Sequence, residues 1–252
     1  MKKEALFDII GEINDNLLPK ETRRRGPYRR LLTAAACIAL CVCLALPILS
    51  QSTRLPLEST EGNISVRYTN RSPMRPHIYS PSLADRLTED DVFGMKSTDI
   101  FHGEILSLRN IVINYGGQKE YRALAEILVH TVYKGDADIE AKTVTLLLPF
   151  GFWFVDDVWF EDASVIGQMK EGMEGIFLAM RYGVDDVSIV NGETLILKDI
   201  AQYGLRDGER FCILEGESGL IGDAITYESL FCNHPTATLE DAKKYVMDML
   251  RE

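Results

Sequence analysis

The most distinctive hydrophobic pattern in the chain is an uninterrupted apolar segment near the N-terminus. Residues 31–50 read LLTAAACIALCVCLALPILS and contain no charged residue. A helix of this length spans about 30 Å, which matches the hydrocarbon core of a bilayer. The segment therefore predicts one transmembrane helix.

Charges on the two sides of this segment predict its orientation. One charged residue, Arg54, follows closely, whereas five arginines crowd the preceding side: Arg23, Arg24, Arg25, Arg29 and Arg30. Positive charge favours the cytoplasmic side. We therefore expect a single-pass protein of the cell membrane with residues 1–30 in the cytosol and the C-terminal part outside. A cleaved signal peptide and a buried core helix are the alternatives, and the sequence leaves cleavage open.

The tail before this segment has the pattern of an amphipathic helix. Its apolar residues recur at spacings of three and four: Leu6, Ile9, Ile10, Ile13 and Leu17. Pro19 ends the pattern. The opposite face is acidic, whereas helices that lie on a membrane surface usually have a basic polar face. We therefore expect the apolar stripe to contact a cytosolic protein partner; the alternative is a tail with no special role.

Residues 51–90 are rich in proline, serine and threonine. Proline fixes φ and cannot donate to a sheet, so this range predicts a stalk between membrane and domain. Within it Ile64, Val66 and Tyr68 alternate with polar residues, which predicts one short strand that joins the domain.

Residues 91–252 show mainly the alternation of β-strands. Strands are predicted at 101–108, 121–133, 143–148, 174–182 and 211–214, with a hairpin of 187–190 and 193–197 around the turn Asn191-Gly192. Thr238 and Asp241 have the spacing of a capping box before a C-terminal helix. The pattern predicts an α+β fold that is mainly β: an antiparallel, barrel-like extracytoplasmic domain with a C-terminal helix, able to fold alone.

Composition and charge narrow the class of partner. Of 252 residues, 46% are apolar and 26% charged, which is ordinary for a globular protein. Residues 1–30 hold 8 Lys and Arg against 5 Asp and Glu, whereas residues 51–252 hold 19 against 33. The exported part is thus strongly acidic, which argues against binding nucleic acid.

Candidate chemistry is sparse. Of the four histidines, His102 and His130 lie on neighbouring predicted strands, where Glu104 or Glu126 could join them. No pair has the helical spacing of a metal site, and no nucleophile motif is present. We therefore expect no catalytic residue, cofactor or metal, and a protein that is not an enzyme.

Two further sets of residues are candidates, one for a partner-binding surface and one for a disulfide. Trp153, Phe154 and Trp159 could form an exposed aromatic patch for a partner, although packing in the core is the alternative. Cys212 and Cys232 are the cysteines of the exported part, and the compartment permits a disulfide between them.

The chain resembles two groups of proteins. The opening Phe7–Asp15, the arginine cluster, the single span and the segments Lys119–Ala125 and Gln168–Gly175 resemble uncharacterised single-pass envelope proteins of Gram-positive bacteria, some of which are similar to membrane-bound anti-sigma regulators. The tail is short for such a regulator and has no His or Cys. The exported domain also resembles OB-like barrels of the netrin-module type, through the residues 101–108, 132–135, 143–148, 169–172 and 176–178.

The function that these features favour is binding or sensing outside the cell, with signalling through the cytosolic tail. A structural protein of the cell envelope is the alternative. An anchored hydrolase is a weaker alternative, because the sequence offers no nucleophile or metal constellation.

Overall fold

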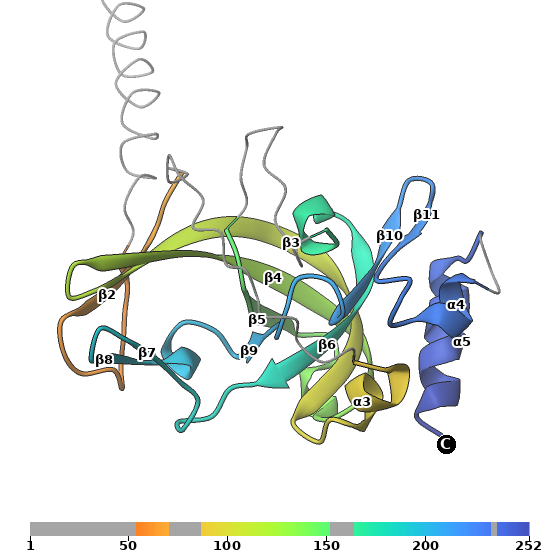
Figure 1. Cartoon of the computed structure of the whole chain (residues 1–252), viewed down its shortest axis with the longest axis horizontal. Coiled ribbons are helices and arrows are strands. Elements are labelled where there is room, and N and C mark those ends of the chain that lie inside the picture. Colours follow the sequence, from red (N-terminus) through yellow and green to blue (C-terminus); the bar gives the residue numbers. More distant parts are fainter. Residues whose placement is uncertain (1–53, 71–86, 152–163, 233–235, 252) are drawn as a thin grey trace, which may run out of the picture. The chain divides into compact units, whose positions relative to one another are not determined.

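The computed structural model describes residues 54–70, 87–151, 164–232 and 236–251 (Figure 1). All of them belong to one compact unit, Ser50–Glu252. Outside these residues lie the tail 1–30, which contains the apolar stripe from Leu6 to Leu17, and the apolar segment 31–50. In the part that is described, no helix is both long enough and apolar enough to cross a membrane.

Nine strands of the described residues form one sheet, in the order β1-β2-β3-β4-β5-β9-β6-β10-β11. Their bounds are Arg54–Leu55 (β1), Ile64–Tyr68 (β2), Thr98–Tyr115 (β3), Gln118–Lys134 (β4), Thr143–Leu148 (β5), Glu174–Arg181 (β6), Tyr203–Gly204 (β9), Cys212–Gly216 (β10) and Gly219–Ile221 (β11). Strand β3 also pairs with β6, so β3, β4, β5, β9 and β6 pair in a closed circuit. These pairings are antiparallel except for β5 with β9, which run parallel.

Bulges and close backbone contacts bend the long strands into this circuit. His102 pairs with Thr131 and Gly103 with Val129, so that His130 is an extra residue between their partners. Such a bulge bends and twists the strand that contains it. Gly103 lies opposite Gly175 of β6, and a Cβ at Gly103 would stand 2.6 Å from a carbonyl oxygen of β4. Glycine is therefore required where β3 passes between its two neighbours.

Two separate clusters of buried apolar residues hold the sheet together. The larger one, the barrel core, includes Phe101 and Phe177, whose ring centroids are 5.8 Å apart. The smaller one, the second core, includes Val66, Tyr115 and Leu195 and lies where β2 pairs with the last residues of β3. Strands β7 (Val187–Val190) and β8 (Glu193–Ile196) form their own two-stranded sheet beside it.

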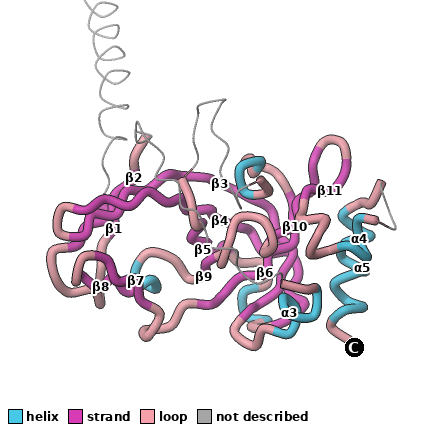
Figure 2. Tube along the Cα trace, viewed as in Figure 1, coloured by secondary structure: helices cyan, strands magenta, loops and turns pink. Residues whose placement is uncertain are grey.

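Helices lie at the opposite end of the unit from β7 and β8 (Figures 1 and 2). They are α3 (Glu89–Gly94), α4 (Glu228–Phe231) and α5 (Leu239–Met249). Single 3-10 turns lie elsewhere in the chain, at Ala137–Ile139 (η2), Ile166–Gln168 (η3) and, directly after β8, Leu197–Asp199 (η4). Thr88 and Thr238 begin α3 and α5 with complete capping boxes. Buried residues of α5, such as Ala242 and Val246, pack on the barrel core.

The predicted class is confirmed in its main lines: the described chain is mainly β, with a large sheet and a C-terminal helix. The hairpin at Asn191-Gly192 and the strand Ile64–Tyr68 are also confirmed. Two expectations need correction. The sheet begins at Arg54, well before residue 91, because β1 and β2 extend it beyond β3. It is also not wholly antiparallel, since β9 joins β5 in parallel.

Candidate functional site

A cleft of about 610 Å³ opens between the start of α3 and α4. Leu87, Glu89 and Asp90 line one side, and Ile225, Glu228 and Ser229 line the other. A second cavity of about 470 Å³ shares Glu89 and Ser229 and continues along α5. We call the two together the helix cleft. It is a concave feature of the described residues, and concave surfaces are where small ligands usually bind.

A hydrogen-bonded pair joins the two walls of the helix cleft. Ser229 donates to one carboxylate oxygen of Glu89 from its hydroxyl, at 2.7 Å, and from its backbone N–H, at 3.1 Å. These residues are 140 positions apart in the chain. The N-terminus of α3 is thereby fixed against α4, and the pair lies where the two cavities meet.

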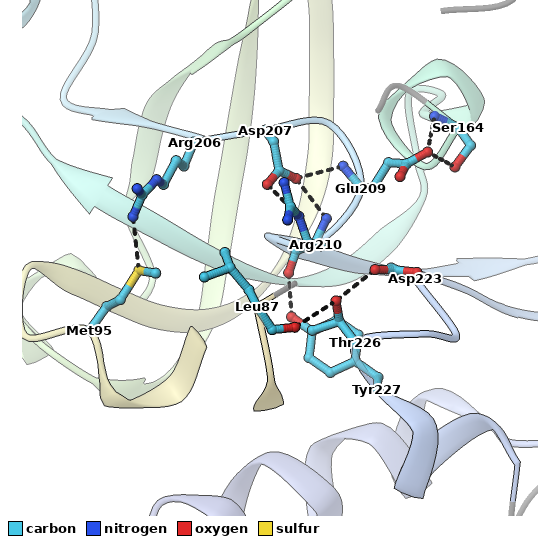
Figure 3. A network of polar contacts seen from close by, with 10 residues as sticks. All are labelled: Leu87, Met95, Ser164, Arg206, Asp207, Glu209, Arg210, Asp223, Thr226 and Tyr227. Carbon is cyan, nitrogen blue, oxygen red and sulfur yellow. Dashed lines mark hydrogen bonds and ion pairs between the residues drawn. The ribbon is translucent and has the colours of Figure 1, made fainter. Parts of the chain in front are cut away.

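Beneath the helix cleft, a network of polar contacts anchors its α4 wall to the barrel (Figure 3). The hydroxyl of Thr226 donates to Asp223 at 2.6 Å, and the buried Tyr227 donates to the backbone carbonyl of Arg210. Asp207 in turn accepts from the side chain of Arg210 at 2.9 Å. Burial raises the pKa of Tyr227 well above its usual value, so this hydroxyl keeps its proton and remains a donor.

The lining of the helix cleft is acidic. Asp90 and Glu228 are exposed beside Glu89, and the neighbouring cavity adds Asp241 and Asp248 with a single lysine, Lys244. Carboxylates accept hydrogen bonds and attract cations. The arrangement suits a ligand that presents amino or guanidinium groups.

Both cysteines of the described residues are free thiols, so the candidate disulfide is not formed. Cys212 lies on β10 inside the barrel core, whereas Cys232 is exposed at the end of α4 and lines the helix cleft. Burial also raises the pKa of the Cys212 thiol, which leaves it protonated and unreactive.

His102 and His130, which the sequence places on neighbouring predicted strands, lie close together in the structure. The ring centroids of His102 and His130 are 5.1 Å apart. The carboxylate beside them is not Glu104 or Glu126 but Glu174, whose oxygen is 2.7 Å from Nε2 of His102. Among the described residues, no three His, Cys, Asp or Glu side chains are grouped so that they could hold a metal ion.

A second charged cluster lies where β3, β6 and β9 pair with one another. Asp99 accepts a hydrogen bond from Nε of Arg181 at 3.1 Å and another from the hydroxyl of Tyr203 at 3.0 Å. Arg181 also reaches Asp136 at 2.9 Å. Burial and the nearby Asp99 raise the pKa of Tyr203 to about 12. Every member of this cluster has a partner within it, so we assign it a structural role in holding β3, β6 and β9 together.

Several expected site residues belong to parts of the chain other than the described ranges. The aromatic residues Trp153, Phe154 and Trp159 lie outside the described residues, as does the stripe from Leu6 to Leu17. Conversely, sequence patterns did not indicate the helix cleft. One local signal was available, since Thr88 and Asp91 have the spacing of a capping box that marks the start of α3. The contact of Glu89 with Ser229 has no local signature.

Comparisons of the chain with protein-family models, with curated proteins and with solved structures found no match. The geometry of the described residues is therefore the support for the candidate site.

Proposed function

We propose that this is a single-pass membrane protein that binds a ligand outside the cell and signals through its cytosolic tail, in the manner of an anti-sigma regulator. The membrane part of the proposal rests on residues 31–50, which have no charge and follow five arginines. The binding part rests on the helix cleft. Binding without covalent chemistry, and without a cofactor, is part of the same proposal.

The exported unit, in this proposal, is a barrel of the OB type. Support comes from the pairing circuit: five strands pair in the order β3-β4-β5-β9-β6 and back to β3, with the one parallel contact between β5 and β9. OB barrels are five-stranded and are used widely as binding modules. Because one fold hosts many functions, the barrel does not identify the ligand.

The single observation that carries the binding proposal is the pair Glu89–Ser229. It holds α3 and α4 in a fixed relation, while Asp90 and Glu228 remain exposed in the cleft between them. A preformed site loses less conformational entropy when a ligand binds. A ligand with basic groups is favoured, since carboxylates line both walls.

The test compares two variants of the full-length protein in cells. D90K/E228K reverses the charge of the cleft, and I9D/I13D disrupts the tail stripe. We expect I9D/I13D to lose the partner that wild-type residues 1–30 recover from a cytosolic extract, and to alter a set of transcripts. D90K/E228K should retain the partner and alter an overlapping set.

The matched control is E61K/D185K, which reverses two exposed acids that lie shortly before β2 and β7, strands at the other end of the unit from the helices. It should leave both the partner and the transcripts unchanged. Cleft variants that behave like this control would contradict the binding proposal. A reporter that works only outside the cytoplasm, fused after Glu252, tests the orientation, and its silence would contradict the membrane part.

A further inference from the structure

The hairpin of β7 and β8 leaves one main-chain edge open. Leu197, directly after β8, donates its N–H to the carbonyl of Asp186 at 2.9 Å, so Asp186 and every second residue after it bond to β8. Bonded and non-bonded positions alternate along an antiparallel pair. The N–H and C=O groups of Val187 and Ile189 therefore point away from β8, toward the outer edge of β7.

The two edges of the hairpin differ in what covers them. On the β8 edge, the N–H of Ile196 donates to the hydroxyl of Thr60 at 3.0 Å. Among the described strands β7 pairs with β8 alone, and no other described residue bonds to the outward groups of Val187 and Ile189. An open strand edge is a template for pairing with another chain, and proteins usually blunt it with lysine, proline or a bulge. Strand β7 has the sequence VSIV and contains none of these.

The outer face of β7 is apolar as well. Ile189 is 67% exposed and Val187 is 40% exposed, and the two share one face because side chains alternate along a strand. On the other face, Ser188 accepts from the hydroxyl of Tyr115 at 3.0 Å, and Leu195 of β8 is fully buried in the second core. The hairpin is thus held to the unit by its inner face, while its outer face is exposed.

Charge decides which kind of surface could cover this edge. Asp185 and Asp186 directly precede β7. Carboxylates are repelled by anionic lipid headgroups, and open main-chain groups gain no hydrogen bond from hydrocarbon. Another strand supplies both hydrogen bonds and apolar side chains. A strand therefore fits this edge, and a lipid surface does not.

We propose that the covering strand is β7 of a second copy of this chain, antiparallel to the first, with the two-fold axis at Ser188. In this register Val187 lies opposite Ile189 of the second copy, and Ile189 lies opposite Val187 of the second copy. Each of these pairs exchanges two main-chain hydrogen bonds, because both residues point their groups outward. The four apolar side chains then share one face.

The charges beside β7 fit the same register. Asp186 lies opposite Val190 of the second copy, and Asp185 lies opposite Asn191 of the second copy, so no acid faces an acid. Like charges directly opposite each other would be destabilising. The edge is therefore self-complementary in hydrogen bonds, apolar contacts and charge.

The membrane supplies the concentration that so small an interface needs. Stable complexes in solution bury about 1,200 Å² or more, and the pairing of two four-residue strands alone falls below that. Two copies anchored in one membrane meet at a high effective concentration. The strength of the pairing therefore rests on the membrane part of the proposed function, whereas its register does not.

Disulfide crosslinking of the full-length protein in membranes tests the register. Every cysteine except the buried Cys212 is replaced by alanine, and S188C is added. Opposite residues of a non-bonded antiparallel pair have Cα atoms about 4.5 Å apart, which is within the range of a disulfide. We expect mild oxidation to convert most S188C chains to a product of twice the mass of the chain.

The matched control for position is T194C, at an exposed residue of β8. In the proposed pairing it lies three strand spacings, about 14 Å, from its copy, so it should give no dimer. I189K, added to S188C, places a charge in the apolar contact at a side chain that is exposed, so the chain should fold normally. It should slow dimer formation about tenfold, because two cross-strand apolar pairs are lost. M247K puts the same charge on an exposed apolar residue of α5 and should change nothing.

Equal amounts of dimer from S188C and T194C, or an S188C dimer that I189K leaves unchanged, overturn the proposed pairing. A product whose mass is not twice that of the chain also overturns it, because another protein then covers β7. Absence of the S188C dimer overturns it too, whether or not the chain resists extraction of the membranes with alkaline carbonate. Release of the chain by carbonate contradicts only the membrane part of the proposed function, so the two failures are distinguishable.

Discussion

The barrel core and the second core stabilise one sheet by different means. Around the barrel core, large side chains such as Phe101, Phe177 and Phe211 are fully buried, and hydrophobic burial is the dominant source of stability. Around the second core, the entering segment 59–63 is held by carboxylates: Asp199 accepts from the backbone of Ser59 and Thr60, and Glu193 from that of Asn63. Apolar burial hardly depends on pH, whereas a carboxylate bond does. The two ends of the unit should therefore respond differently to the same stress.

The largest expected effect is on the barrel core. F177A removes a fully buried ring that contacts Phe101, and it should lower the free energy of unfolding by about 4 kcal/mol. Urea unfolding of residues 50–252, followed by circular dichroism, gives the value. F177L retains more of the volume and should cost about 1 kcal/mol. Equal losses in the two variants would show that packing of the ring is not what matters.

A smaller and more local loss is expected in the second core. Leu195 is fully buried on β8, and L195A should cost about 2 to 3 kcal/mol. Hydrogen exchange should show the loss in β2, β7 and β8, while the amides of β6 keep their protection. The exposed neighbour Thr194 provides the control T194A, with little effect expected. Equal loss of protection in β6 would mean that the two cores unfold as one.

Local sequence signals account for much of the fold. The C-terminal helix could be predicted because its capping box, Thr238 with Asp241, is a local pattern in the sequence. The hairpin could be predicted because its turn, Asn191-Gly192, is also local. The closure of the barrel could not, because it depends on β9, a strand of two residues that pairs with the distant β5. A strand this short has no periodicity to detect.

The same contrast applies to the candidate site. The approach of His102 to His130 followed from neighbouring strands, but Glu174 as their partner required the pairing of β3 with β6. The contact of Glu89 with Ser229 depends on how α4 docks on the sheet. Contacts between consecutive strands can be predicted from the sequence. Contacts that form only when the sheet closes or a helix docks on it require the structure.

A further prediction concerns the acid sensitivity of the second core. Burial acts to raise the pKa of Asp199, but hydrogen bonds from Thr60 and Ser59 outweigh it and lower the pKa. A lowered carboxyl pKa stabilises the fold above about pH 4, and this stability is lost as the pH falls through the folded-state value. D199N should cost about 1 kcal/mol at pH 7 and remove this part of the acid response.

Exchange of the Ser59 and Thr60 amides measures this effect directly, because both donate to Asp199. The exposed Asp185 provides the control D185N, which should leave those amides unchanged. Protection of Ser59 and Thr60 that falls at low pH equally in D199N and wild type would contradict the assignment to Asp199. The barrel amides should show no change from D199N.

The smallest effect concerns the turn of the β7–β8 hairpin. Gly192 has φ of 79°, and a Cβ there would meet no atom within 4 Å, so the cost of G192A is purely that of the backbone. We expect a loss of about 1 kcal/mol, seen as faster exchange in β7 and β8 alone.

Gly94 at the end of α3 is the matched control. A Cβ added there would also meet open space, but the φ of Gly94 is not positive. G94A should therefore be neutral or slightly stabilising, since alanine lowers the entropy of the unfolded chain. If both variants cost the same, the left-handed backbone at Gly192 does not determine the stability of the hairpin.

A second outcome bears on the whole comparison of the barrel core with the second core. If G192A also speeds exchange in the barrel strands, the hairpin and the barrel core unfold as one cooperative unit. The two ends of the unit would then not respond independently to stress.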